Sequence, residues 1–219
     1  GNDFENGALH PIQVLWSEFG NTAYTTGPGI QKNLKGDGIN RDCVGVHFHQ
    51  VKDGSALSAI SVDGLGKSKD ADRAAQEISR GFLLATDILS GERGAKKNLE
   101  DADLSDEAAA CAAVVAIKQN LDGTYDMDGG TYGDARWLVI DGTRILASQE
   151  QNLAAVEKDL EKKKPAGFTP GDREVAEQLK RSKQRYGTRW ERVVVNVLQS
   201  DRGTIQTVIM HGIKPGAVV

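Results

Sequence analysis

The sequence contains few of the residues that define several protein classes. Cysteine occurs only at Cys43 and Cys111, which lie far apart and form no CxxC pair, so a disulfide framework is excluded. We expect both to be reduced core residues of an intracellular, cytoplasmic protein. Aromatic residues make up 5% of the chain, which argues against a base-stacking surface for single-stranded nucleic acid. No apolar run approaches the ~20 residues of a membrane-spanning helix.

The chain also has no large excess of positive or negative charge. The chain has 27 Lys or Arg and 31 Asp or Glu, a formal net charge of −4, which predicts neither a nucleic-acid nor a membrane partner. Hydrophobic residues make up 39% of the 219, enough for a sizeable core and too many for a disordered chain. We therefore expect a single domain over residues 1–219 and a monomer. Because the chain begins with Gly1 and not with Met, a preceding targeting segment and flanking domains stay open.

The first part of the chain reads as strands followed by a helix. Residues 43–51 alternate in a way typical of a strand, Asp53-Gly54 signals a hairpin, and residues 56–62 form a short buried strand. Apolar residues at steps of three and four then predict one helix over residues 70–89, ended by Ser90-Gly91. The polar stretch 92–106 is expected to be a loop.

The second part of the chain reads as an antiparallel meander followed by helices. Asp-Gly pairs at Asp122-Gly123 and Asp141-Gly142 separate apolar runs, which is a strong hairpin signal. Helices are expected over residues 149–164 and after Thr169, with Pro170 in the first turn. The remaining expected strands cover residues 192–198 and 204–210. This order favours antiparallel sheets with helices packed outside them.

Four aspartates lie where an expected strand meets a turn, namely Asp42, Asp63, Asp134 and Asp201. Carboxylates and backbone carbonyls at strand ends are the oxygen ligands that hard divalent cations prefer. Each aspartate, taken singly, is also explained by ordinary turn chemistry. A metal site therefore depends on their joint order along the chain.

That order resembles the metal-dependent type 2C Ser/Thr protein phosphatases. The resemblance is carried by Asn40-Arg41-Asp42, by Val62-Asp63-Gly64-Leu65-Gly66 followed by an Ala-rich helix, by the strand Ala113-Val114-Val115, and by Gly133-Asp134-Ala135-Arg136. It covers roughly residues 27–153 continuously. The resemblance implies an α+β fold, a four-layer αββα sandwich of two antiparallel sheets flanked by helices.

The resemblance also implies a function and roles for individual residues. The function is hydrolysis of phosphoserine or phosphothreonine in a phosphoprotein substrate by metal-activated water, with two Mn²⁺ or Mg²⁺ ions and room for a third. Asp63 would bridge both ions, Gly64 would offer its carbonyl, and Asp42 would hold water at the second ion. Asp134 would bind the third, weaker ion.

The sequence departs from the family pattern at several positions. Lys67 replaces the second glycine of the family motif, and no arginine precedes Asn40-Arg41-Asp42 where the family has a phosphate-binding one; Lys35 or Arg41 is the expected substitute. Of two late aspartate ligands, only Asp201 has a strong match. We expect it to face Asp63 across a cleft, in a site that binds its metals more weakly than a complete one.

Other functions stay open at this point. A catalytically degenerate phosphatase fold that binds a partner or phosphopeptide would leave the same motifs. An N-terminal-nucleophile hydrolase shares the layered sheets, but the chain offers no convincing processed nucleophile. His47 and His49 share a strand face but have no apparent third zinc ligand. The region Asp122–Gly129 mimics part of a calcium loop without its closing glutamate, so a hairpin tip is expected there.

Overall fold

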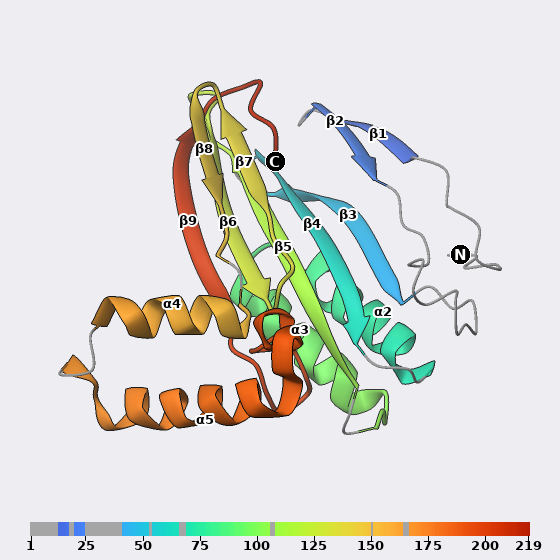
Figure 1. Ribbon diagram of the computed structural model, residues 1–219. Coiled ribbons are helices and arrows are strands. Elements are labelled where there is room, and N and C mark those ends of the chain that lie inside the picture. Colours follow the sequence, from blue (N-terminus) through green and yellow to red (C-terminus); the bar gives the residue numbers. More distant parts are fainter. Residues whose placement is uncertain are drawn as a thin grey trace.

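The longest strands of the computed structural model form one five-stranded antiparallel sheet, in the order β3-β4-β5-β6-β9 (Figure 1). These strands are β3 (Asp42–Val51), β4 (Gly54–Leu65), β5 (Ala109–Gln119), β6 (Tyr125–Tyr132) and β9 (Gln206–Ile213). Two further antiparallel pairs are β1 (Gln13–Ser17) with β2 (Gly20–Tyr24), and β7 (Leu138–Asp141) with β8 (Arg144–Ala147). The structure describes residues 13–17, 20–24, 41–52, 54–65, 69–105, 108–149, 151–163 and 167–219.

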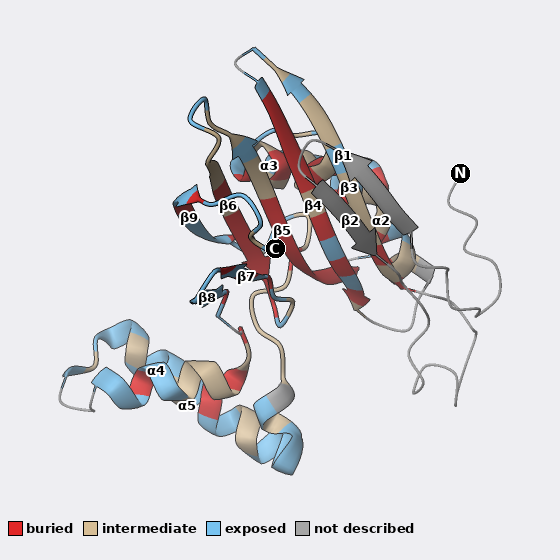
Figure 2. Cartoon of the chain, turned by 90° about the horizontal axis from the view of Figure 1, so that it is seen from above, coloured by how far each residue is buried: buried red, intermediate tan, exposed pale blue. Residues whose placement is uncertain are grey.

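Two helices cover one face of this sheet. They are α2 (Lys69–Leu83) and α3 (Ile88–Asp101). The expected apolar stripe of α2 is fully buried at Ala71, Ala74, Ala75 and Ile78. It packs on the inward-facing residues of β4 and β5, where buried residues concentrate (Figure 2). Small alanines bring the helix backbone close to the sheet, so this layer positions the end of β4.

The expected single helix over residues 70–89 is wrong, because one helix ends at Leu83 and a second begins at Ile88. The carboxylate of Asp87 accepts a hydrogen bond from the Ser90 N–H at 2.8 Å and so caps a new helix, α3, in place of the expected loop. Gly91 does not end a helix. It lies inside α3, where a Cβ would be 2.4 Å from the Phe82 ring.

The opposite face of the sheet carries the β7–β8 hairpin and the C-terminal segment. Trp137 and Val139 pack with Val115 and Met127 in a second core cluster. Backbone hydrogen bonds between Ile140 and Val218 join the C-terminal segment to β7. Antiparallel sheet layers with helices outside them confirm the expected α+β sandwich.

The helices α4 (Leu153–Lys163) and α5 (Pro170–Tyr186) form a pair with the short 3-10 helix η2 (Gly187–Arg192). They share a small core of their own around Leu160 and Leu179. Thr169 and Asp172 form a capping box that begins α5, as Thr-Pro predicted. The expected strand over 192–198 is wrong: η2 extends to Arg192, and isolated bridges at Val194 and Leu198 replace the strand.

Among the residues that the structure describes, no helix combines the length and the apolar character that crossing a membrane requires.

Candidate functional site

Asp42 and Asp63 are register partners in the antiparallel pair of β3 and β4. The neighbouring Gly64 N–H donates to the Arg41 carbonyl at 2.9 Å, which makes that pair hydrogen-bonded. Hydrogen-bonded and non-hydrogen-bonded pairs alternate along an antiparallel ladder, so Asp42 and Asp63 occupy a non-hydrogen-bonded pair. In such pairs the Cβ atoms lie about 4.5–5.5 Å apart. The register therefore brings these two carboxylates together on one sheet face.

Gly64 fixes the position of the end of β4 against α2. A Cβ at this residue would lie 2.3 Å from the Ala71 carbonyl oxygen and 2.8 Å from the Arg41 carbonyl oxygen. Only glycine allows these backbones to approach so closely. Because side chains alternate along a strand, Asp63 projects away from α2, and it is exposed to solvent.

Cys111 connects the pair of Asp42 and Asp63 to the turn at Gly133-Asp134. Cys111 is the register partner of Asp63 on β5 and is fully buried. Burial, and to a smaller extent the Asp134 carboxylate, raise the pKa of the Cys111 thiol to about 12, so the thiol stays protonated. Gly133 has φ 68°, and a Cβ there would lie 2.4 Å from the Cys111 sulfur. Asp134 and Asp63 therefore both lie within electrostatic reach of the same thiol.

Asp201 lies in a loop between Leu198 and β9. Its side chain is exposed, pairs with Arg202 at 3.4 Å, and lines a pocket of about 390 Å³ with Leu99 and Ser105 at the end of α3. Asp63 does not line that pocket. The expectation that Asp201 faces Asp63 across a cleft stays a prediction.

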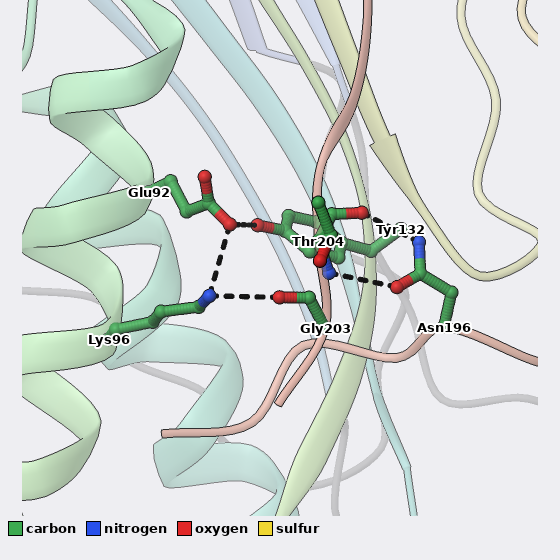
Figure 3. A network of polar contacts seen from close by, with 6 residues as sticks. All are labelled: Glu92, Lys96, Tyr132, Asn196, Gly203 and Thr204. Carbon is green, nitrogen blue, oxygen red and sulfur yellow. Dashed lines mark hydrogen bonds and ion pairs between the residues drawn. The ribbon is translucent and has the colours of Figure 1, made fainter. Parts of the chain in front are cut away.

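A polar network holds the Asp201 loop to the sheet and to α3 (Figure 3). Lys96 donates to the Gly203 carbonyl at 2.8 Å and pairs with Glu92 at 3.1 Å. The Tyr132 hydroxyl donates a hydrogen bond to the Glu92 carboxylate at 2.5 Å. Burial and the Glu92 carboxylate raise the pKa of Tyr132, so this hydroxyl remains a donor.

The loop is fixed from its other side by Asn196. Its side-chain oxygen accepts a hydrogen bond from the Thr204 N–H at 2.9 Å, and its side-chain nitrogen donates one to the Thr204 carbonyl at 2.7 Å. Gly203, at φ 87°, could carry no Cβ, which would lie 2.4 Å from the Val197 carbonyl oxygen. Contacts of Gly203 and Thr204 with Lys96 and Asn196 thus fix the backbone of the loop that carries Asp201.

A cleft of about 630 Å³ lies over the sheet face opposite α2 and α3. Val44 and Ser61 line it. Each lies two residues along its strand from Asp42 or Asp63 and projects from the same face, so the two carboxylates lie next to the cleft. Arg136 also lines the cleft, two residues after Asp134. No role of its own was predicted for Arg136, although an arginine two residues after an aspartate at a strand end is a signal for anion binding.

The expected phosphate-binding residues are placed differently. Lys35 lies outside the described residues. Arg41 is buried, at 4% exposure, and strand alternation puts its side chain on the face of Cys43, away from Asp42. The phosphate-binding role of both residues stays a prediction.

A divalent cation fits Asp42 and Asp63 by the chemistry of the donors, which are hard carboxylate oxygens. Over the described part of the chain, no three His, Cys, Asp or Glu side chains gather closely enough to hold a metal ion. Mg²⁺ is usually bound in proteins through one or two carboxylates, with water and substrate phosphate as its other ligands. The pair therefore fits a cation that binds together with phosphate better than one held by the protein alone.

The histidine pair and the calcium-like region both have structural explanations. His47 and His49 stack edge-on with ring centroids 4.6 Å apart, and His49 Nε2 lies 3.1 Å from Ser58 Oγ. Burial, then the neighbouring His47, lower the pKa of His49. The hairpin tip expected from the calcium-like pattern is confirmed at Asp122, but Asp126 lies in strand β6.

The chain has the fold of the type 2C protein phosphatases. No family model matches the sequence, and no curated protein matches it either. Among solved structures, the serine/threonine phosphatase Stp1 from Staphylococcus aureus matches 95% of this chain and 74% of its own, with a TM-score of 0.55 and 14% identity. A Stage II sporulation E family protein from Thermanaerovibrio acidaminovorans matches 78% of this chain and 72% of its own, with a TM-score of 0.50 and 20% identity. At these identities the likeness establishes the fold alone.

Proposed function

We propose that this chain is a metal-dependent phosphatase of phosphoproteins that hydrolyses phosphoserine or phosphothreonine. One observation carries the proposal: Asp42 and Asp63 form a cross-strand pair of carboxylates beside an open cleft, within a type 2C phosphatase fold. Two carboxylates at this spacing match the protein part of a typical Mg²⁺ or Mn²⁺ site. The remaining ligands would be water and the phosphoryl oxygens of the substrate.

Each residue of the site then has a role. Asp63 would hold the cations, Asp42 would hold water at the second ion, and the Gly64 carbonyl would be a further oxygen ligand. Asp134 and Asp201 serve as additional carboxylates, for two ions and a third, weaker one. When bound, the cations supply Lewis-acid polarisation of the phosphoryl group and a bound water of lowered pKa.

The other residues position the substrate and restrict water. Arg136, which lines the cleft, binds phosphoryl oxygens as a planar, permanently charged donor. Lys35 and Arg41 are the further candidates for this role. The buried Cys111 thiol keeps its proton, so it adds no negative charge next to Asp63 and Asp134.

The test is hydrolysis of p-nitrophenyl phosphate and of a phosphoserine peptide with added Mn²⁺. We expect Mn²⁺-dependent turnover in the wild type and its loss in Asp63→Ala. Thermal unfolding should be nearly unchanged, because the exposed Asp63 side chain contributes little packing. Asp122→Ala, at an exposed hairpin tip, is the matched control and should keep full activity. Equal turnover in Asp63→Ala and wild type would remove Asp63 from the mechanism.

The second candidate function is a degenerate phosphatase fold that binds a phosphopeptide or partner without hydrolysing it. It is favoured by one observation: no group of three metal-ligating side chains occurs among the described residues. Titration calorimetry with Mn²⁺, in the absence and presence of phosphate, separates the two functions. Heat of binding that requires both supports the enzyme, and no heat under either condition supports the degenerate fold.

A further inference from the structure

The segment from Lys180 to Arg192 has a strongly basic sequence within a weakly acidic chain. It contains six Lys or Arg and one Glu, whereas the whole chain has a formal net charge of −4. The segment covers the second half of α5 and all of η2. Such a local excess of positive charge is an electrostatic signal for an anionic partner.

Three of these six charges are exposed and pair with no described acidic side chain. They are Lys180, Arg181 and Arg189. Arg181 and Arg185 are four residues apart on α5 and therefore lie on one face of the helix. We call Lys180, Arg181, Arg185 and Arg189 the basic surface.

The helix that carries the basic surface is held in place by its other side. Leu179 is buried against α4 in the small core of the helix pair. Lys183 is turned inward, where it pairs with Glu157 and lies 4.1 Å from the centre of the Trp190 ring. These contacts fix α5 and η2 relative to α4, so the basic surface is organised before a partner binds.

The basic surface is connected to the candidate phosphatase site through the residues that follow η2. Val194, two residues after η2, packs against Gly133: a Cβ at Gly133 would lie 2.8 Å from a Val194 methyl carbon. Gly133 directly precedes Asp134. Val194 is five positions after Arg189 along the chain, so their Cα atoms are at most about 18 Å apart.

We propose that the basic surface binds an acidic segment of the substrate protein that flanks its phosphorylated residue. The proposal rests on the proposed phosphatase function and names the class of substrate, a phosphoprotein with Asp or Glu near the phosphorylation site. An extended peptide spans about 3.3–3.6 Å per residue, so the acidic residues that reach the basic surface would lie several positions from the phosphorylated residue of the substrate.

A short acidic peptide fits this surface better than a nucleic acid does. The net charge of −4 repels a long polyanion, while a peptide of a few residues meets only the local positive charge. The basic surface spans α5 and η2, where Tyr186 and Trp190 lie against Arg185 and Lys183, so these two rings are already engaged and do not form a free platform on which bases stack.

The test compares two phosphoserine peptides, one with Asp and Glu around the phosphoserine and one with Asn and Gln at the same positions. In Lys180→Glu/Arg181→Glu we expect kcat/KM for the acidic peptide to fall about tenfold, with a smaller effect at high salt. Turnover of the neutral peptide and of p-nitrophenyl phosphate should be unchanged. The control Arg73→Glu/Lys97→Glu makes the same change of net charge at exposed positions of α2 and α3 and should behave as the wild type.

A second readout keeps this proposal separate from the phosphatase function. Fluorescence anisotropy of the labelled acidic peptide needs no hydrolysis, so binding that is lost in Lys180→Glu/Arg181→Glu supports the docking surface even if p-nitrophenyl phosphate is never hydrolysed. Equal binding of the acidic and neutral peptides overturns the proposal. Tighter binding of a single-stranded RNA oligonucleotide of equal charge overturns it as well.

Discussion

Asp42 of β3 and Asp63 of β4 stand directly opposite each other in the sheet, although they are far apart along the chain. The pairing places two carboxylates on the face that α2 and α3 leave open. Gly64 maintains this arrangement, since any larger residue would push the end of β4 away from Ala71. The metal chemistry proposed for the chain thus depends on strand register and on one glycine contact.

The role of Asp201 is tested by metal titration of Asp201→Asn. We expect the activity of the wild type to rise with Mn²⁺ into a range on the order of millimolar, since few carboxylates gather at the site. If Asp201 supplies a ligand, its replacement should raise the half-saturating Mn²⁺ concentration about tenfold or more. Asp122→Asn, on an exposed hairpin, is the control. Identical titrations of Asp201→Asn and wild type would show that another residue supplies the ligand.

The strands were largely predictable from the sequence because their signals are local. Alternation over residues 43–51 and the two Asp-Gly turns require only neighbouring residues, and β3, β5 and β7–β8 confirm them. Strand β6 was not predicted, because Asp126, Asp128 and two glycines lack the strand pattern. Its glycines have a tertiary reason: a Cβ at Gly129 would lie 2.7 Å from the Trp137 ring.

The candidate site was predictable in part for the same reason. Asp42 lies at the start of one strand and Asp63 near the end of the next. The antiparallel register then brings the two together. The position of Asp201 depends instead on the polar network of Glu92, Lys96 and Tyr132, which joins residues distant in sequence. No local pattern encodes such a network.

The contact between α2 and α3 leads to a prediction about Gly81. A Cβ at Gly81 would lie 2.2 Å from the Ala95 backbone nitrogen, so glycine serves close helix packing here. Gly81→Ala should lower the free energy of unfolding by about 1–3 kcal/mol through overpacking. Gly171→Ala in α5 is the control: its nearest neighbour is 3.9 Å away, and it should gain about 0.5–1 kcal/mol. Urea unfolding midpoints measure both, and equal midpoints would contradict the packing argument.

The Tyr132–Glu92 hydrogen bond leads to a prediction about Tyr132→Phe. The ring is fully buried, so the substitution removes only the hydroxyl that donates to Glu92 at 2.5 Å. We expect a loss of about 1–3 kcal/mol in the free energy of unfolding, because the bond is made to a carboxylate. Tyr186→Phe, at a half-exposed position, should cost almost nothing. Chemical denaturation of both variants provides the measurement, and equal stability would show that the Tyr132 hydroxyl does not stabilise the fold.

The final prediction concerns the pH dependence of stability through Asp128. Its Oδ1 atom is buried and has no hydrogen-bond partner among the described residues. Burial, then the charge of Asp87, raise the pKa of Asp128. A carboxyl with a raised pKa in the folded state binds its proton more tightly there than in the unfolded chain. It therefore lowers stability as the pH rises through the folded-state pKa, and it has no such effect below the unfolded-state pKa.

Asp128→Asn removes this titration, so we expect it to be more stable than the wild type at about pH 7 and similar to it at about pH 3. Asp122→Asn is a control of opposite sign. The side-chain and backbone hydrogen bonds from Thr124 lower the pKa of Asp122, so this carboxylate stabilises the fold above its unfolded-state pKa and loses that effect as the pH falls. Asp122→Asn should therefore be less stable than the wild type at about pH 7 only. Urea unfolding midpoints of the three proteins at both pH values measure this, and a destabilised Asp128→Asn at neutral pH would show that the Asp128 carboxylate is stabilised in the folded state.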